Sequence, residues 1–281
     1  MKRELAAGVA IPLVLGILFL APALAFNVLV AAIALAALWE FYRLAEKTGH
    51  PVAKTLGILL GGVVLGTAAI LWGPVRFETR SGALVEIVGR VSLFRAAGFA
   101  LAATILASLA PMLSRVPPAL ALASAGSTLF GVLAIALPAS TLCFLRRVSP
   151  LAVLFLLLVV WTCDSCAYYV GSRFGRHRLA PAVSPGKTWE GSWAGLAGAT
   201  LFGAVAGTWA LLPALGPVRG AAAGALASTA GQLGDLVESL WKRGAGVKDS
   251  GVFLPGHGGF YDRIDSLLFA GPVLAAFLTG N

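Results

Sequence analysis

Residues 150–170 read PLAVLFLLLVVWTCDSCAYYV, and this stretch decides the class of fold. A run of about 20 mostly apolar residues is long enough to cross the hydrocarbon core of a bilayer as an α-helix. A single acid, Asp164, interrupts the run. An ionisable side chain inside a membrane helix is a functional residue by default, because its burial has to be offset by a partner. The stretch therefore predicts a membrane helix and one residue of the functional site.

The same apolar pattern recurs along the chain. Of 281 residues, 58% are hydrophobic and 12% are charged, and the mean hydropathy is +0.89. These values argue against a soluble protein and indicate several membrane spans. No linker divides residues 1–281, so we expect one all-α membrane domain, with N-terminal helices in 1–150 and catalytic helices in 151–281. About nine transmembrane helices are expected, near residues 6–21, 24–41, 55–73, 92–110, 119–145, 150–170, 190–212, 219–238 and 264–279.

The basic residues predict the orientation of these spans. Nine spans would place 14 of the 21 Lys and Arg residues on one side and 7 on the other. The positive-inside rule assigns the richer side to the cytoplasm. The polar clusters 171–189 and 239–263 fall on that side, so we expect a multi-pass protein of the inner (plasma) membrane whose active site faces the cytoplasm. The first apolar run is expected to be a retained helix, not a cleaved signal peptide.

Charge, cysteine and glycine content limit the partners. The net charge of +9 suits a protein seated against anionic lipid headgroups. Its basic residues are dispersed among apolar spans, so nucleic acid is not expected. The three cysteines lie in or beside apolar segments and do not support a disulfide framework. Small residues, as in Gly220–Gly224, allow close helix packing and are compatible with a homodimer.

Residues 234–266, GDLVESLWKRGAGVKDSGVFLPGHGGFYDRIDS, hold four of the five aspartates between two apolar segments. Carboxylates that hold a divalent cation, beside cations that meet phosphate oxygens, suit a polyphosphate ligand. Mg²⁺ is the expected ion, because it takes one or two protein carboxylates and completes its shell with water and phosphate. If the helix over 219–238 continues past Ser239, then Asp235, Glu238 and Ser239 share one face.

Two features at the end of this stretch allow more than one interpretation. Asp262 and Asp265 lie three residues apart at the start of the last expected helix, where carboxylates can also cap the helix and complement its dipole. Gly256–Gly259 is flexible backbone whose N–H groups can approach an anion closely. His257, between these glycines, is a candidate phosphate donor, acid or base, or merely a loop residue.

A second polar segment, residues 184–191, reads SPGKTWEG. Its Gly-Lys-Thr resembles the end of a P-loop, but Pro181 occupies the position of the required glycine and no β-strand is expected before it. We therefore reject a P-loop. Ser184 and Lys187 are expected on a short loop that opens the next helix, whose N-terminus favours an anion.

The order of the motifs resembles one family. The run from Ser239 to Asp265 is similar to the signature of phosphatidate cytidylyltransferases, also called CDP-diacylglycerol synthases: Ser239-x-x-Lys-Arg, Lys248-Asp-Ser-Gly, Leu254-Pro-Gly-His-Gly-Gly and Asp262-Arg-Ile-Asp. Upstream, Asp164-x-x-Ala-Tyr, Phe174-Gly and residues 184–191 also resemble stretches of that family, in the same order. Trp241 departs from the family's usual aliphatic residue and is expected to alter packing beside Lys242 more than chemistry.

The resemblance implies transfer of CMP from CTP to phosphatidate, giving CDP-diacylglycerol and pyrophosphate in phospholipid biosynthesis. It implies one or two Mg²⁺ ions, with a monovalent cation as a further candidate, and CTP, phosphatidate and the bilayer as partners. The family's Gly-Asp-Leu and Lys-Asp motifs imply that Asp235 and Asp249 bind the metal. The other implied catalytic residues are Lys248, His257, Asp262 and Arg263. The implied substrate-binding residues are Asp164, Ser184, Lys187, Ser239, Lys242, Arg243 and Asp265.

Two alternatives stay open at this point. A related CTP-dependent enzyme that acts on another lipid, such as a polyisoprenol kinase or an archaeal-type lipid cytidylyltransferase, would share the nucleotide and metal chemistry. A transporter would also combine many apolar spans with intramembrane acids. It would distribute polar residues along several helices, whereas this sequence concentrates them in the second half.

Overall fold

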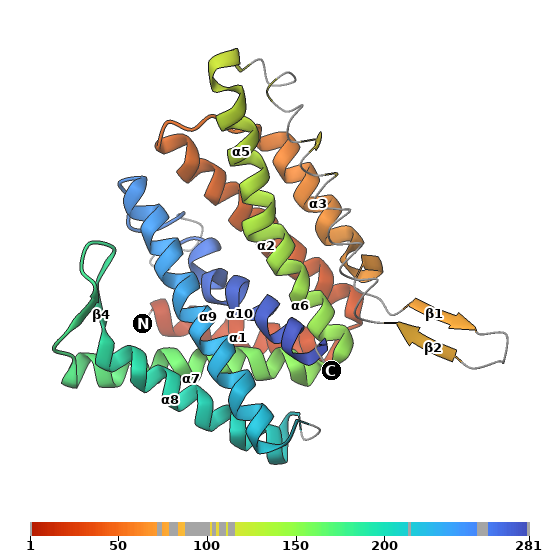
Figure 1. Cartoon of the computed structure of the whole chain (residues 1–281), viewed down its shortest axis with the longest axis vertical. Coiled ribbons are helices and arrows are strands. Elements are labelled where there is room, and N and C mark those ends of the chain that lie inside the picture. The colour runs from red at the N-terminus through yellow and green to blue at the C-terminus, as the bar shows by residue number, and fades with distance from the viewer. Residues whose placement is uncertain are drawn as a thin grey trace.

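The computed structural model describes residues 2–71, 75–78, 84–87, 116–212, 215–251 and 258–279, together with 102, 105, 106 and 111. Helices dominate this part of the chain (Figure 1). The N-terminal half contains α1 (Lys2–Leu20), α2 (Ala23–Lys47), α3 (Lys54–Leu71), and a continuous helical segment made of η1 (Pro118–Leu120), α5 (Ala121–Gly131), the π-helical η2 (Val132–Ala136) and α6 (Leu137–Val148). The C-terminal half contains α7 (Pro150–Phe174), α8 (Trp189–Val205), η3 (Ala206–Ala210), α9 (Gly216–Gly244) and α10 (Tyr261–Thr279).

The helix positions agree with eight of the nine expected segments, and the ninth, 92–110, lies largely outside the described residues. Three of the described helices are long and apolar enough to cross a membrane: Ala23–Lys47, Pro118–Val148 and Pro150–Phe174. Ile11–Leu20 and Lys54–Thr67 are shorter apolar helices. The structure therefore confirms a nearly all-α protein with three described helices that could span a membrane, whereas a count of nine transmembrane helices is not confirmed.

Two antiparallel hairpins correct the all-α prediction. Strand β1 (Val75–Glu78) pairs with β2 (Leu84–Ile87), and β3 (Arg178–Ala180) pairs with β4 (Ser184–Thr188). The second hairpin replaces the short loop expected before α8, and a strand does precede the Gly-Lys-Thr sequence. The P-loop is still excluded, because Lys187 lies within β4 itself and not in a loop between a strand and a helix. The two hairpins project from opposite sides of the molecule (Figure 1).

Local sequence explains where the central helices begin. Ser149 caps α7 by accepting a hydrogen bond from the Leu151 N–H at 3.1 Å, and Pro150 occupies the first turn, where its missing N–H costs nothing. Thr188 caps α8 in the same way, with the Gly191 N–H at 3.2 Å. The end of the β3–β4 hairpin is thus also the start of α8, which fixes Lys187 directly before this helix.

The C-terminal helices pack around α9, which contacts both α8 and α10, while α7 packs against α8. Helices α8 and α9 approach closely at Gly203 and Gly220, where a Cβ atom on either residue would overlap the other's carbonyl oxygen. Small residues at a helix interface allow this kind of approach. Gly220, one of the glycines compatible with a dimer contact, therefore packs against another helix of the same chain.

Candidate active site

Helices α7 and α9 and the β3–β4 hairpin enclose a cavity of about 450 Å³. Four residues expected at the site from the sequence line it together: Asp164 from α7, Ser184 and Lys187 from β4, and Asp235 from α9. Asp164 is exposed to this cavity. The cavity is polar at these side chains and large enough for part of a nucleotide or a phosphate headgroup.

A carboxylate of α8 also contacts the residue that precedes the hairpin. Glu190 accepts hydrogen bonds from the His177 N–H, at 3.2 Å, and contacts the His177 ring Nδ1 at 2.6 Å. Its own backbone N–H and the His177 ring lower the pKa of Glu190 to about 2. Glu190 therefore stays ionised at neutral pH, and the contact holds the hairpin that carries Ser184 and Lys187 against the start of α8.

Lys187 and Asp235 form an ion pair across the cavity, with Lys187 Nζ 2.7 Å from Asp235 Oδ2. Both side chains keep contact with solvent, at 28% and 35% exposure. Ser239, one turn further along α9, donates a long hydrogen bond of 3.4 Å to Asp235 Oδ1. The continuous helix α9 thus places Asp235, Glu238 and Ser239 on one face, as the spacing predicted.

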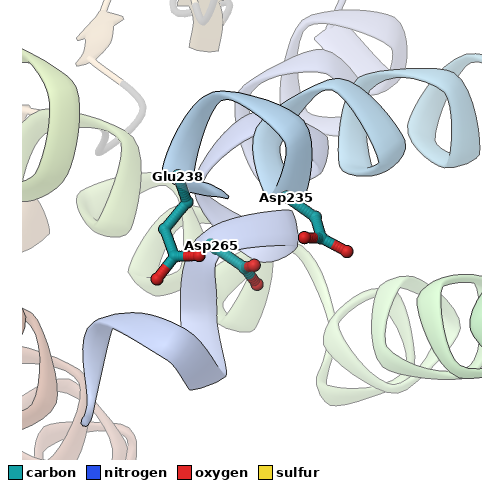
Figure 2. Close-up of side chains that lie close together, drawn as sticks. All are labelled: Asp235, Glu238 and Asp265. Atoms are coloured by element: carbon teal, nitrogen blue, oxygen red, sulfur yellow. The ribbon is translucent and has the colours of Figure 1, made fainter. Parts of the chain in front are cut away.

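Three carboxylates gather where α9 meets the first turns of α10. Oxygen atoms of Asp235, Glu238 and Asp265 lie within 4.8 Å of one another, and Figure 2 shows the Asp265 side chain between those of Glu238 and Asp235. Glu238 is only 1% exposed, and its Oε1 has no hydrogen-bond partner. A buried carboxylate oxygen without a donor is suited to a cation, and the cluster offers more carboxylates than the one or two that Mg²⁺ usually takes from a protein.

This carboxylate cluster differs from the metal pair expected from the sequence. Asp235 belongs to it, but Asp249 is an exposed residue outside the cluster. Glu238 and Asp265 take part instead. The sequence held a signal for Glu238 in its spacing from Asp235, whereas the approach of Asp265 depends on how α10 packs against α9. The role of Asp249 in metal binding stays a prediction.

Lys242 is held between two acids. Its Nζ lies 2.5 Å from Glu238 Oε2 and 2.6 Å from Asp262 Oδ1, and its side chain is 12% exposed. The pair of contacts joins the end of α9 to the start of α10. The preceding residue, Trp241, stacks on Tyr261 at 6.2 Å between ring centroids and meets the Phe41 ring edge-on at 5.4 Å. Trp241 thus has the packing role that was expected of it.

Asp262 has the contacts of a capping residue. Its Oδ2 accepts hydrogen bonds from the Gly259 N–H at 2.7 Å and the Ser250 N–H at 3.0 Å, and it lies 3.0 Å from the Ser250 hydroxyl, whose one proton it shares with Glu40. These bonds satisfy backbone donors around the start of α10, in agreement with the capping interpretation. A catalytic role of Asp262 stays a prediction.

The remaining predicted site residues lie around this centre. Arg243 is exposed, and its Nε donates to the Val183 carbonyl oxygen at 3.2 Å, which joins α9 to the turn of the hairpin. Lys248, Asp249 and Arg263 are exposed. His257 lies outside the described residues. Gln232, which was not predicted, lines the cavity and accepts a hydrogen bond from the Ser192 hydroxyl at 2.5 Å.

Several known proteins are similar to part of this sequence. It is 42% identical to a phosphatidate cytidylyltransferase of Pseudomonas aeruginosa over 149 residues, 52% of this chain and 55% of that protein. It is 46% identical to a phosphatidate cytidylyltransferase of Synechocystis sp. over 119 residues, 42% of this chain and 40% of that protein. A phosphatidate cytidylyltransferase of Haemophilus influenzae is 43% identical over 127 residues, 44% of each chain.

In these three alignments the chain spans about half the length of the relatives or less. A family model covers far more of the chain. The model described as "Cytidylyltransferase family" matches residues 1–280. The match includes the N-terminal helices as well as the segments that carry the cavity and the carboxylate cluster. The chain therefore belongs to the cytidylyltransferase family.

Proposed function

We propose that the protein is a phosphatidate cytidylyltransferase, which joins phosphatidate and CTP to form CDP-diacylglycerol and pyrophosphate. The observation that carries the proposal is the meeting of Asp164, Lys187 and Asp235 around one cavity beside the carboxylate cluster. Acids that bind a cation and a lysine that binds phosphate are the groups that nucleotidyl transfer requires. The names of the relatives add the lipid substrate to this chemistry.

In the proposed reaction, a phosphate oxygen of phosphatidate attacks the α-phosphorus of CTP. The bond between that phosphorus and the oxygen bridging to the β-phosphorus breaks, and pyrophosphate leaves with the electron pair. The chain would chiefly hold the two phosphates in line and offset the charge of the leaving group. Lys187 has the position and exposure to donate to a phosphate in the cavity. A divalent cation held by Asp235, Glu238 and Asp265 would supply further charge neutralisation.

The membrane helices suit this substrate, because the acyl chains of phosphatidate remain in the bilayer while its phosphate lies at headgroup depth. Spans such as α7 would hold the cavity at that depth. The excess of Lys and Arg predicted on one side supports a location in the inner membrane with the site facing the cytoplasm, from which CTP arrives.

The test is an assay of purified protein in detergent with phosphatidate, labelled CTP and Mg²⁺, with EDTA in a parallel sample. We expect labelled CDP-diacylglycerol and pyrophosphate in equal amounts, and neither product with EDTA. The variant Asp235→Asn should lose turnover, whereas Glu46→Gln, an exposed acid on α2 that pairs with Lys54, should keep it. Formation of CDP and a phosphorylated alcohol would instead indicate a kinase, and no use of CTP with any lipid would overturn the proposal.

A further inference from the structure

Glu40 is an acid in the N-terminal half that enters the neighbourhood of the site. It lies in α2, within the apolar sequence Leu38-Trp-Glu-Phe-Tyr42, and is 6% exposed. Burial of a carboxylate is costly unless hydrogen bonds and charges compensate for it. An acid in such a place therefore requires specific partners, and those that the structure describes all come from the segment around the start of α10.

Three donors converge on the Glu40 carboxylate. Oε1 accepts from the Phe260 N–H at 3.1 Å, and Oε2 accepts from the Tyr261 N–H at 2.9 Å and the Ser250 hydroxyl at 2.9 Å. Two of the donors are backbone groups at the N-terminus of α10, which carries a partial positive charge and favours an anion. These partners are 210 to 221 residues from Glu40 in sequence. Glu40 thus caps α10 from another part of the chain.

The glycines of the last polar segment fit this carboxylate. A Cβ atom on Gly251 would overlap Glu40 Oε1, and a Cβ atom on Gly259 would overlap Glu40 Oε2. Only glycine leaves room for the acid at these two places. Gly251 and Gly259 therefore make room for the Glu40 side chain. This role is separate from the approach of backbone N–H groups to phosphate that the sequence predicted for Gly256–Gly259.

The contacts lead directly to residues of the proposed site. Ser250 follows Lys248 and Asp249, and its hydroxyl lies between Glu40 Oε2 and Asp262 Oδ2, at 2.9 and 3.0 Å. Tyr261 opens the helix that carries Asp265 into the carboxylate cluster. Glu40 therefore holds two segments that supply predicted metal and phosphate ligands, while it belongs neither to the described carboxylate cluster nor to the residues that line the cavity.

We propose that Glu40 is a positioning residue: its carboxylate holds Ser250 and the first turn of α10 in the arrangement in which Asp249 and Asp265 serve the reaction. The inference rests on the proposed cytidylyl transfer.

The first test is Glu40→Gln, which keeps the shape of the side chain. It replaces one acceptor oxygen with an NH₂ group, which cannot accept a hydrogen bond from the N–H donors. Loss of a group that orients ligands lowers activity on the order of 10- to 100-fold. We expect a fall of this size in kcat, with the KM for CTP changed less than about threefold.

Two further variants separate positioning from general stability. Glu40→Asp keeps the charge and should recover part of the lost kcat. Glu46→Gln removes the same charge from the same helix at an exposed ion pair and should leave kcat unchanged. A double-mutant cycle compares the variants Ser250→Ala and Glu40→Gln with the double variant. The double variant should lower kcat by less than the product of the two separate factors, because Glu40 acts partly through Ser250.

Hydrogen exchange gives a readout that does not depend on turnover. In Glu40→Gln, the Phe260 and Tyr261 amides should exchange faster than in the wild type, and in Glu46→Gln they should not. The inference is wrong if Glu40→Gln keeps wild-type kcat, or if its loss of activity only follows the fraction of folded protein and Glu40→Asp recovers nothing. A wild-type protein that forms no CDP-diacylglycerol would overturn the proposed function and, with it, the positioning role, while the exchange result would still test the contact.

Discussion

Replacement of Lys242 by Met gives the sharpest test of how the site is built. The Lys242 ammonium group lies between Glu238 and Asp262, whose side chains are 1% and 9% exposed. Methionine keeps most of the apolar stem and removes the charge. Glu238 would then lose its cationic partner and be left beside the carboxyl groups of Asp262 and Asp265. Asp262 would keep its bonds from Ser250 and Gly259.

The size of the effect follows from burial. Removal of one partner of a buried ion pair typically destabilises a protein by about 3–5 kcal/mol, because a charge remains buried without compensation. At about 1.4 kcal/mol per factor of ten, this raises the unfolded fraction on the order of 100- to 4,000-fold. Lys54→Met is the matched control, since the Lys54–Glu46 pair is 23% and 43% exposed. Its loss should be below about 1 kcal/mol.

Equilibrium unfolding in mixed micelles with a rising fraction of denaturing detergent, followed by far-UV circular dichroism, measures both variants. The double variant Lys242→Met/Glu238→Gln should recover most of the stability, because the unpaired buried charge is gone. If Lys242→Met costs no more than Lys54→Met, or if the double variant is as unstable as the single one, Lys242 does not hold α9 to α10 by this ion pair.

Four further predictions address chemistry. Glu238→Gln should raise the Mg²⁺ concentration for half-maximal turnover by at least about tenfold; an unchanged value would remove Glu238 from the cation site. Asp249→Asn should abolish turnover while the protein still inserts and folds, and full activity would exclude Asp249 as a ligand. Lys187→Gln should raise the KM for CTP with a stability loss below about 1 kcal/mol. Because the pKa of Glu190 is lowered from 4.5 to about 2, its contact with His177 should be complete above pH 4.5 and lost toward pH 2; exchange of the His177 amide, compared with that in Glu190→Gln, measures this.

Features set by local sequence were predictable. The apolar runs marked eight described helices, since each helix needs only a continuous stretch of suitable residues. The shared face of Asp235 and Glu238 follows from the helical repeat alone. The β3–β4 hairpin was missed because Pro185 and Gly186 are both unfavourable in strands. In this two-stranded sheet β4 is an edge strand, where such residues are tolerated.

Features set by packing between distant segments were not predictable. Asp265 joins Asp235 and Glu238 only because α10 lies against α9. Glu40 was overlooked because a single acid in an apolar helix gives no sign of which backbone it will meet 210 to 221 residues later. The polar clusters of the sequence lie in the second half, and Glu40 adds one buried acid of the first half beside them.

Burial distinguishes the roles of Lys187 and Lys242, for which the sequence predicted the same role. Lys187 and Lys242 both stood as predicted phosphate contacts, and each is paired with a carboxylate in the structure. An ion pair as exposed as Lys187–Asp235 is worth at most about 1 kcal/mol, so an incoming phosphate and cation can replace it at little cost. Lys242 has two carboxylates around it in a buried place, and its transfer to a phosphate would leave Glu238 uncompensated. Lys187 is therefore the lysine that should govern CTP kinetics, while Lys242 should govern stability.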